Sequence, residues 1–191
     1  MDRAVQMNDM TVTEAQRDVR TTFVGGFAGQ LVSGTIWLLS AATATWWSPK
    51  TAMEVLVIGG FFIFPLTRLL LQAMSRPSSL PKGHPMNALG MQVAFVLPPC
   101  LLVAFAATAL HQNWFYPAFM IVLGAHYLPF IFMYGMWQFG VLAASLMGSG
   151  VLIGMYLPST FSLGGWSTAL MLLVFAFVGR AVALADNQTA K

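Results

Sequence analysis

Four polar side chains that interrupt long apolar stretches are the ones that could do chemistry: His126, Arg68, Gln30 and Gln92. If these stretches cross a membrane, His126 lies near the midplane, where an imidazole can accept a proton or hold a ligand. The alternative is a neutral histidine that is hydrogen-bonded inside a packed helix bundle. We take the four residues as a candidate polar site near the midplane, with both interpretations of His126 open.

Arg68 shares its apolar stretch with one other charged residue, Glu54, and thirteen uncharged residues separate the two. Fourteen residues of helix measure about 21 Å, which is shorter than the ~30 Å hydrocarbon core of a bilayer. One of the two charges therefore lies below the interface, or the bilayer thins around it. Either Arg68 extends its side chain to the headgroups, or it faces an internal polar site.

No catalytic or metal-binding motif accompanies these residues. The three histidines, His84, His111 and His126, fall in different segments, and the single cysteine, Cys100, has no CxxC partner. The sequence contains no HExxH, GxSxG, GxGxxG or P-loop stretch. A nucleophile and base pair of Cys100 and His126 would lack a third group to orient the base. We therefore predict no catalytic residues, no metal site and no cofactor.

The composition indicates that the polar residues are set in a membrane. Of the 191 residues, 58% are hydrophobic and 8% are charged, whereas about 25% are charged in an average soluble domain. Residues 83–179 contain no Lys, Arg, Asp or Glu, and an ionised side chain near the bilayer centre costs roughly 2.5–3.5 kcal/mol. The basic residues are scattered beside apolar stretches, which is typical of topology signals. The lipid bilayer is the predicted partner, and no nucleic acid is expected.

The apolar stretches predict an all-α, polytopic transmembrane bundle of six spans. About 20 helical residues cover the hydrocarbon core. A short amphipathic helix is expected in the N-terminal segment 1–22, because Thr11 and Glu14 fit the S/T-x-x-E capping box. The predicted transmembrane domain is 23–184, followed by a tail at 185–191, with a polar loop at 75–85 and spans near 23–47, 51–74, 86–110, 114–135, 137–157 and 163–184.

The distribution of basic residues predicts that both termini are cytoplasmic. With six spans, one side of the membrane receives eight of the nine Lys and Arg residues, and the other side receives Lys50 alone. The positive-inside rule places the richer side in the cytoplasm, together with the loop at 75–85.

Small residues in the first span predict close helix packing. Gly25, Gly29 and Ser33 recur at every fourth position, and Gly34 belongs to a neighbouring stripe. Small side chains let the backbones of membrane helices approach each other, which replaces the hydrophobic drive that is missing in lipid.

Prolines inside the second, third and fourth spans predict kinks at Pro65, Pro98, Pro99 and Pro129. Each proline removes an amide donor and frees a carbonyl about four residues earlier. Such carbonyls are tolerated where protein or water satisfies them, so we expect spans two to four to wall any polar cavity. Kinks that serve packing alone are the alternative.

Five stretches carry a resemblance to other proteins: EAQRDVR at 14–20, GQLVSG at 29–34, FPLTR at 64–68, NWFYPAFM at 113–120 and GAHYLPF at 124–130. In these stretches the chain resembles a family of uncharacterised multi-pass bacterial membrane proteins, over most of residues 12–182. The resemblance implies a bacterial inner-membrane setting. Because that family has no assigned activity, the resemblance implies no mechanism and no site residues.

Three classes of function remain open. The leading hypothesis is a small-solute or proton-linked transporter or channel with an unidentified small-molecule ligand, and a homo-oligomer is expected because short loops leave little room for a lumen. The second is a non-catalytic scaffold or interaction protein whose polar groups hold helices together. The third, a lipid-modifying membrane enzyme, has the least support because no nucleophile and base pair is visible. A cavity that reaches His126 and Arg68 would favour the first class, and a fully packed interior the second.

Overall fold

The computed structural model describes residues 10–157 and 160–189, which contain helices and no strands. Six of the helices are long and apolar enough to cross a membrane, so the predicted all-α bundle of six spans is confirmed. The helices are α2 (Val12–Thr22), α3 (Phe27–Trp46), α4 (Pro49–Ala73), α5 (Met86–Leu110), α6 (Phe115–Tyr134), α7 (Gln138–Tyr156) and α8 (Leu163–Thr189), with 3-10 turns η1 (Val24–Gly26) and η2 (Gln112–Trp114).

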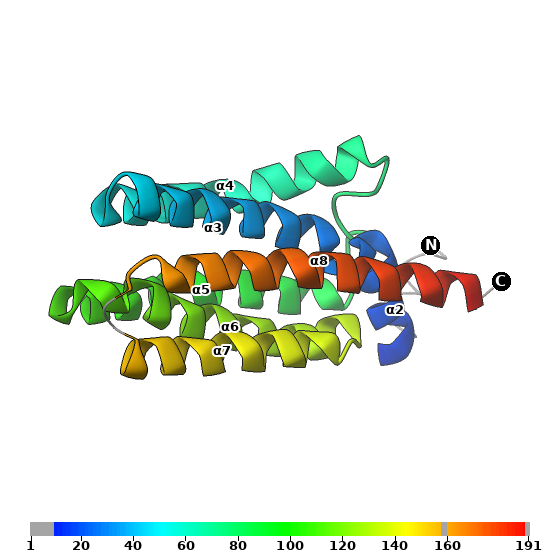
Figure 1. Cartoon of the computed structure of the whole chain (residues 1–191). Coiled ribbons are helices and arrows are strands. Elements are labelled where there is room, and N and C mark those ends of the chain that lie inside the picture. The colour runs from blue at the N-terminus through cyan, green and yellow to red at the C-terminus, as the bar shows by residue number, and fades with distance from the viewer. Residues whose placement is uncertain (1–9, 158–159, 190–191) are drawn as a thin grey trace.

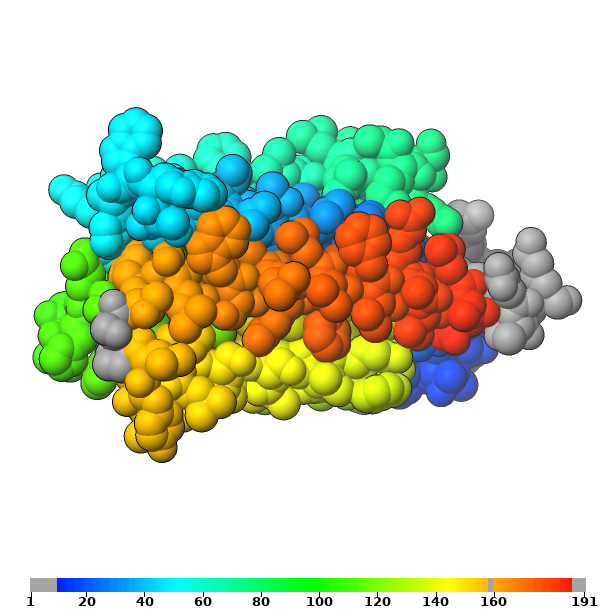
Figure 2. Space-filling view, in the orientation of Figure 1, coloured from blue at the N-terminus to red at the C-terminus, as the bar shows by residue number. Residues whose placement is uncertain are grey.

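The six long helices lie side by side, and α3 is the most deeply buried of them (Figure 1). Helix α3 packs between α4 and α8, while α6 packs between α5 and α7, and α7 and α8 join the two groups. Figure 2 shows α8 on one face of the bundle, between α3 and α7. Helices α4 and α5 are at the edges, since 11% of their most apolar stretches is buried, against 61% for α3.

A sharp turn of the chain at η1 precedes the helix of the first span. Gly25 and Gly26 have φ angles of 64° and 82°, a left-handed conformation that glycine adopts without steric cost. Val24 has a φ of 50°, which is an outlier for a β-branched residue. The helix of the first span therefore starts at Phe27, and Gly25 does not share a continuous helix with Gly29.

Helix α2 begins at the predicted capping box, which is present. The side chain of Glu14 accepts hydrogen bonds from the backbone nitrogen and the hydroxyl of Thr11, at 2.8 and 2.7 Å. The backbone nitrogen of Glu14 donates in return to the Thr11 hydroxyl, at 3.3 Å. These two bonds to its carboxylate hold the pKa of Glu14 below its usual range. Ala15 and Val19 are buried on the apolar face of the same helix.

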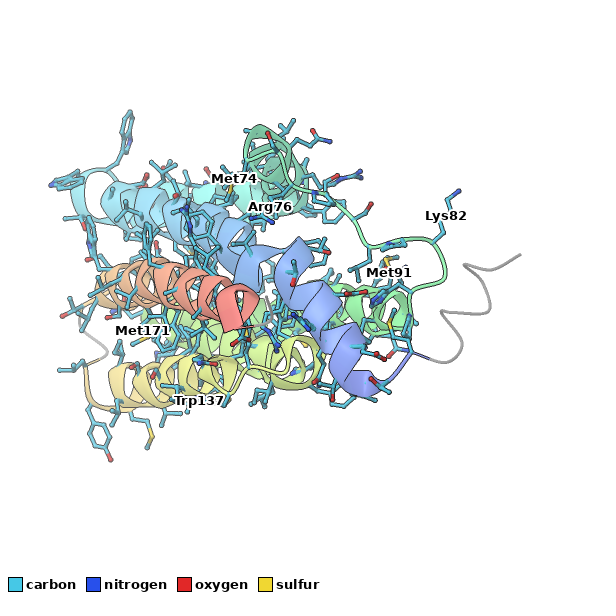
Figure 3. All side chains as sticks on the ribbon, turned by 90° about the vertical axis from the view of Figure 1, so that its right-hand side faces the viewer. Met74, Arg76, Lys82, Met91, Trp137 and Met171 are labelled. Atoms are coloured by element: carbon cyan, nitrogen blue, oxygen red, sulfur yellow. The ribbon has the colours of Figure 1, made fainter. Side chains whose placement is uncertain are left out.

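The same helix lies across one end of the bundle, the end that is turned toward the viewer in Figure 3. Gln16 Nε2 donates to the carbonyl of Phe132 at 2.6 Å, and an Arg20 guanidinium nitrogen donates to the carbonyl of Tyr134 at 2.9 Å. Arg20 Nε also lies 2.9 Å from the carboxylate of Asp186 near the end of α8. Helix α2 thereby satisfies carbonyls in the last turn of α6 and ties α6 to α8.

We call this end of the bundle the basic end. Helix α2, the last turns of α8 and the connection from α4 to α5 all lie there (Figure 1). Arg76 and Lys82 belong to that connection, and Lys82 points away from the helices (Figure 3). Lys50 is at the opposite end, in the first turn of α4.

Candidate functional site

A cavity of about 190 Å³ lies between α3, α4 and α6, in the part of the bundle nearer the basic end. Phe23, just after α2, and Phe139 of α7 complete its wall. The remaining lining residues are Gly26, Ala28, Gly29, Gln30, Ser33, Ile63, Thr67, Leu71, Leu123, His126, Tyr127, Phe130 and Tyr134. The wall is therefore largely apolar and aromatic, with polar groups contributed by three different helices, as is common for small-molecule sites.

Three of the polar residues on this wall carry a buried atom that has no hydrogen-bond partner among the described residues. These atoms are Thr67 Oγ1, His126 Nδ1 and Gln30 Oε1. Buried polar groups are hydrogen-bonded as a rule, and an unsatisfied one costs about 1–3 kcal/mol. Polar residues that carry such atoms converge on this cavity from three helices, which makes it the candidate site for a hydrogen-bonding molecule.

His126 lines the cavity and also interacts with α5. It lies about 16 Å along α6 from Phe115, at 1.5 Å for each residue, and its imidazole interacts with the backbone of Val93 in α5. Its ring packs edge to face against Phe130, with ring centroids 5.2 Å apart. The imidazole is thus contacted by α5 and by its own helix, and the described part of the chain offers its buried Nδ1 no hydrogen bond within the distance and angle limits of a good one.

The structure brings together two of the four residues proposed from the sequence. Gln30 and His126 line the same cavity. Arg68 does not, because its side chain is exposed on α4 and lies over the ring of Phe64, 5.8 Å from the centroid. Gln92 is exposed on α5. The position of Arg68 five residues before the end of α4 fits the interpretation in which it extends to the headgroups.

The cavity has a different set of walls from the one that the prolines suggested. All four prolines lie inside helices, as expected. The residues whose carbonyls they free, however, are exposed and do not line the cavity: Phe61, Ala94, Phe95 and Ala125. We expected the third span, α5, to form part of the wall, but it contributes no lining residue. Helix α3 forms that part of the wall instead.

Of the predicted packing residues of the first span, two face α8 and two line the cavity. Gly25 and Gly34 face α8: a methyl group at Gly25 would overlap the carbonyl of Gly179, and one at Gly34 would lie 3.0 Å from Leu173. Gly29 and Ser33 line the cavity instead. A methyl group at Gly29 would meet Thr67 at 3.9 Å, which is an ordinary contact.

Sequence analysis missed several lining residues that the fold brings to the cavity. Thr67 precedes Arg68, and a threonine inside a membrane helix is unremarkable because its hydroxyl can bond the backbone of its own helix. Tyr127 and Tyr134 are seven residues apart, a spacing that places them on one face of α6 and could have indicated a common environment.

A larger groove of about 1110 Å³ lies at the opposite end of the bundle, along α5, α6 and α7. Its floor includes Pro117, Ala118, Gly150 and Gly154, and none of the buried unpartnered atoms of the described residues belongs to it. The groove is therefore not part of the candidate site. In the described residues, no group of three His, Cys, Asp or Glu side chains could hold a metal ion.

Residues 12–181 match the model of DUF7010, a family of unknown function, and the chain belongs to this family. The matched region contains every residue that lines the cavity. The expected likeness to a family without an assigned activity is thereby confirmed. No curated protein and no solved structure matches the chain.

Proposed function

We propose that this member of DUF7010 is an integral membrane protein that binds a small, uncharged polar solute in the cavity between α3, α4 and α6 and carries it across the membrane. The observation that carries the proposal is the convergence of Thr67, His126 and Gln30, from three helices, on one cavity. Thr67 Oγ1 and His126 Nδ1 are buried there and lack a hydrogen-bond partner among the described residues. Helix packing alone would be served better by apolar side chains at these positions.

The chemistry of the wall favours an uncharged solute. The threonine hydroxyl can donate or accept, the histidine Nδ1 can accept in its neutral form, and the Gln30 amide offers both functions. Among the residues that the structure describes, no Asp, Glu, Lys or Arg side chain lines the cavity, and an unpaired ion in such a site is strongly disfavoured. The volume corresponds to the liquid share of about six waters, at about 30 Å³ each. A molecule the size of urea or glycerol meets these conditions.

The proposed orientation places the basic end in the cytoplasm. Eight of nine Lys and Arg residues belong to that side of a six-span chain, and basic residues accumulate on the cytoplasmic side of membrane proteins. We propose the inner membrane of a bacterium as its location, with both termini cytoplasmic. Helix α2 then covers the cytoplasmic end of the cavity, because Phe23 joins its last turn to the cavity wall.

Scaffolding is the second candidate, and the edge helices favour it. Phe61 and Phe64 of α4 and Phe95 of α5 are 68 to 75% exposed, so these faces meet either lipid or another protein. A homo-oligomer formed through α4 and α5 would cover such faces, and the same assembly is compatible with transport.

The proposed transport activity is tested with purified protein in liposomes. Shrinkage and reswelling under osmotic gradients of urea and of glycerol report solute permeability. Thr67→Val keeps the shape of the side chain and removes the hydroxyl, so we expect it to lower the protein-dependent permeability by about tenfold, the equivalent of about 1.4 kcal/mol. Thr35→Val is the matched control, because the Thr35 hydroxyl bonds the carbonyl of Leu31 on an exposed face of α3.

Two results would contradict the proposal. One is a permeability equal to that of protein-free liposomes for both solutes. The other is equal permeability for the Thr67→Val and Thr35→Val variants, which would leave the buried hydroxyl without a role in solute passage.

A further inference from the structure

A second, much smaller void lies on the other side of Gln30, between α3, α7 and α8. Its volume is about 10 Å³, and Gln30, Gln138, Phe139 and Gly179 contribute to its wall. Gln30 and Phe139 also line the main cavity, so the two spaces share part of a wall. The amide of Gln30, which is 3% exposed, stands between them.

Two buried oxygens belong to the residues around this void. Gln30 Oε1 and Gln138 Oε1 have no hydrogen-bond partner among residues 10–157 and 160–189. The Gln30 oxygen is on the side of Gly179, since a methyl group at Gly179 would lie 3.8 Å from it. Both atoms are acceptors, so they cannot bond each other and need a donor between them.

A single water meets this need. A void must offer roughly 10–15 Å³ to hold one water, and the water needs at least two polar partners. Here the volume is at that threshold, and each of the two oxygens can accept a hydrogen bond from one O–H group of the water. The other wall residues are apolar or glycine, so the site has room and partners for one water and no larger molecule.

We propose that one ordered water occupies this void and donates a hydrogen bond to Gln30 Oε1 and to Gln138 Oε1. Gln138 is in the first turn of α7 at the basic end, so the water links that end to the main cavity through the Gln30 amide. Gln138 is then a positioning residue: by holding the oxygen of Gln30 toward α8, it turns the amide nitrogen of Gln30 toward the main cavity. The water site stands whether or not the cavity carries a solute.

An experimental structure of the whole protein in nanodiscs, at a resolution that shows ordered waters, tests the proposal. We expect a density peak within hydrogen-bonding distance, about 2.7–3.2 Å, of both glutamine side chains. An empty void would overturn the proposal. So would a direct bond between the two amides, which would require one of them to be turned by 180°.

Variants provide the second measurement. Gln138→Leu should abolish the peak, whereas Gln72→Leu, at an exposed position of α4, should leave it in place. Gln138→Leu and Gln30→Leu should each lower the melting temperature, because each leaves the remaining amide oxygen without its water. The double variant should therefore lose less than the sum of the two single losses. A peak that survives in Gln138→Leu, or melting-temperature losses that simply add in the double variant, would refute the shared water.

Discussion

Replacing Gly25 with alanine should destabilise the fold, whereas the same change at Gly29, four residues later, should not. Gly25 has a φ of 64°, and a methyl group there would overlap the carbonyl oxygen of Gly179 in α8. A left-handed conformation costs a residue with a Cβ roughly 1–2 kcal/mol, and forcing extra volume into a packed contact costs roughly 1–3 kcal/mol. The obstructing atom is backbone, so it cannot move aside as a flexible side chain would.

Gly29 is in the helical part of the span and lines the cavity. A methyl group there would make an ordinary contact of 3.9 Å with Thr67. Alanine is favoured over glycine in a helix by roughly 0.5–1 kcal/mol. We therefore expect Gly25→Ala to lower the free energy of unfolding by about 2–5 kcal/mol and Gly29→Ala to leave it unchanged or raise it slightly.

The assay is reversible unfolding of the purified protein by a denaturing detergent in mixed micelles, followed by circular dichroism. Gly60→Ala is the reference for helix propensity, because a methyl group at Gly60 would have nothing within 4 Å. If Gly25→Ala were as stable as the original chain, the close contact between η1 and α8 would not exist in solution. If Gly29→Ala were as harmful as Gly25→Ala, the cavity beside Gly29 would be absent.

Two further predictions concern the helix cap and the topology. Because its bonds to Thr11 lower the pKa of Glu14, the capping box should stabilise α2 at neutral pH and lose this effect as the pH falls below about 4.5. Hydrogen exchange of the α2 amides should accelerate over that range, and Thr11→Ala should remove the pH dependence. In a Cys100→Ala background, a cysteine at Ser79 should react with impermeant reagents from the cytoplasmic side and one at Gln112 from the opposite side, and labelling of both from one side would refute the six-span orientation.

Local features of the sequence were sufficient to predict the helices. The six apolar stretches became six helices, because length and hydropathy in one segment decide whether it can cross a bilayer. The pair Thr11 and Glu14 formed its capping box, because both partners are within one turn. Even the break at Gly25 and Gly26 has a local signal in the glycine pair, although we did not expect the helix to stop there.

The tertiary structure decided which polar residues form a site. Gln30 and His126 face the same cavity while Arg68 and Gln92 face outward, and Thr67 enters the site from α4. In a soluble helix, the apolar stripe would have shown which face is buried. In a membrane helix, the face toward lipid and the face toward protein are both apolar. The sequence alone therefore determined that these helices are long and apolar enough to span a membrane, and only their packing determined which side chains meet.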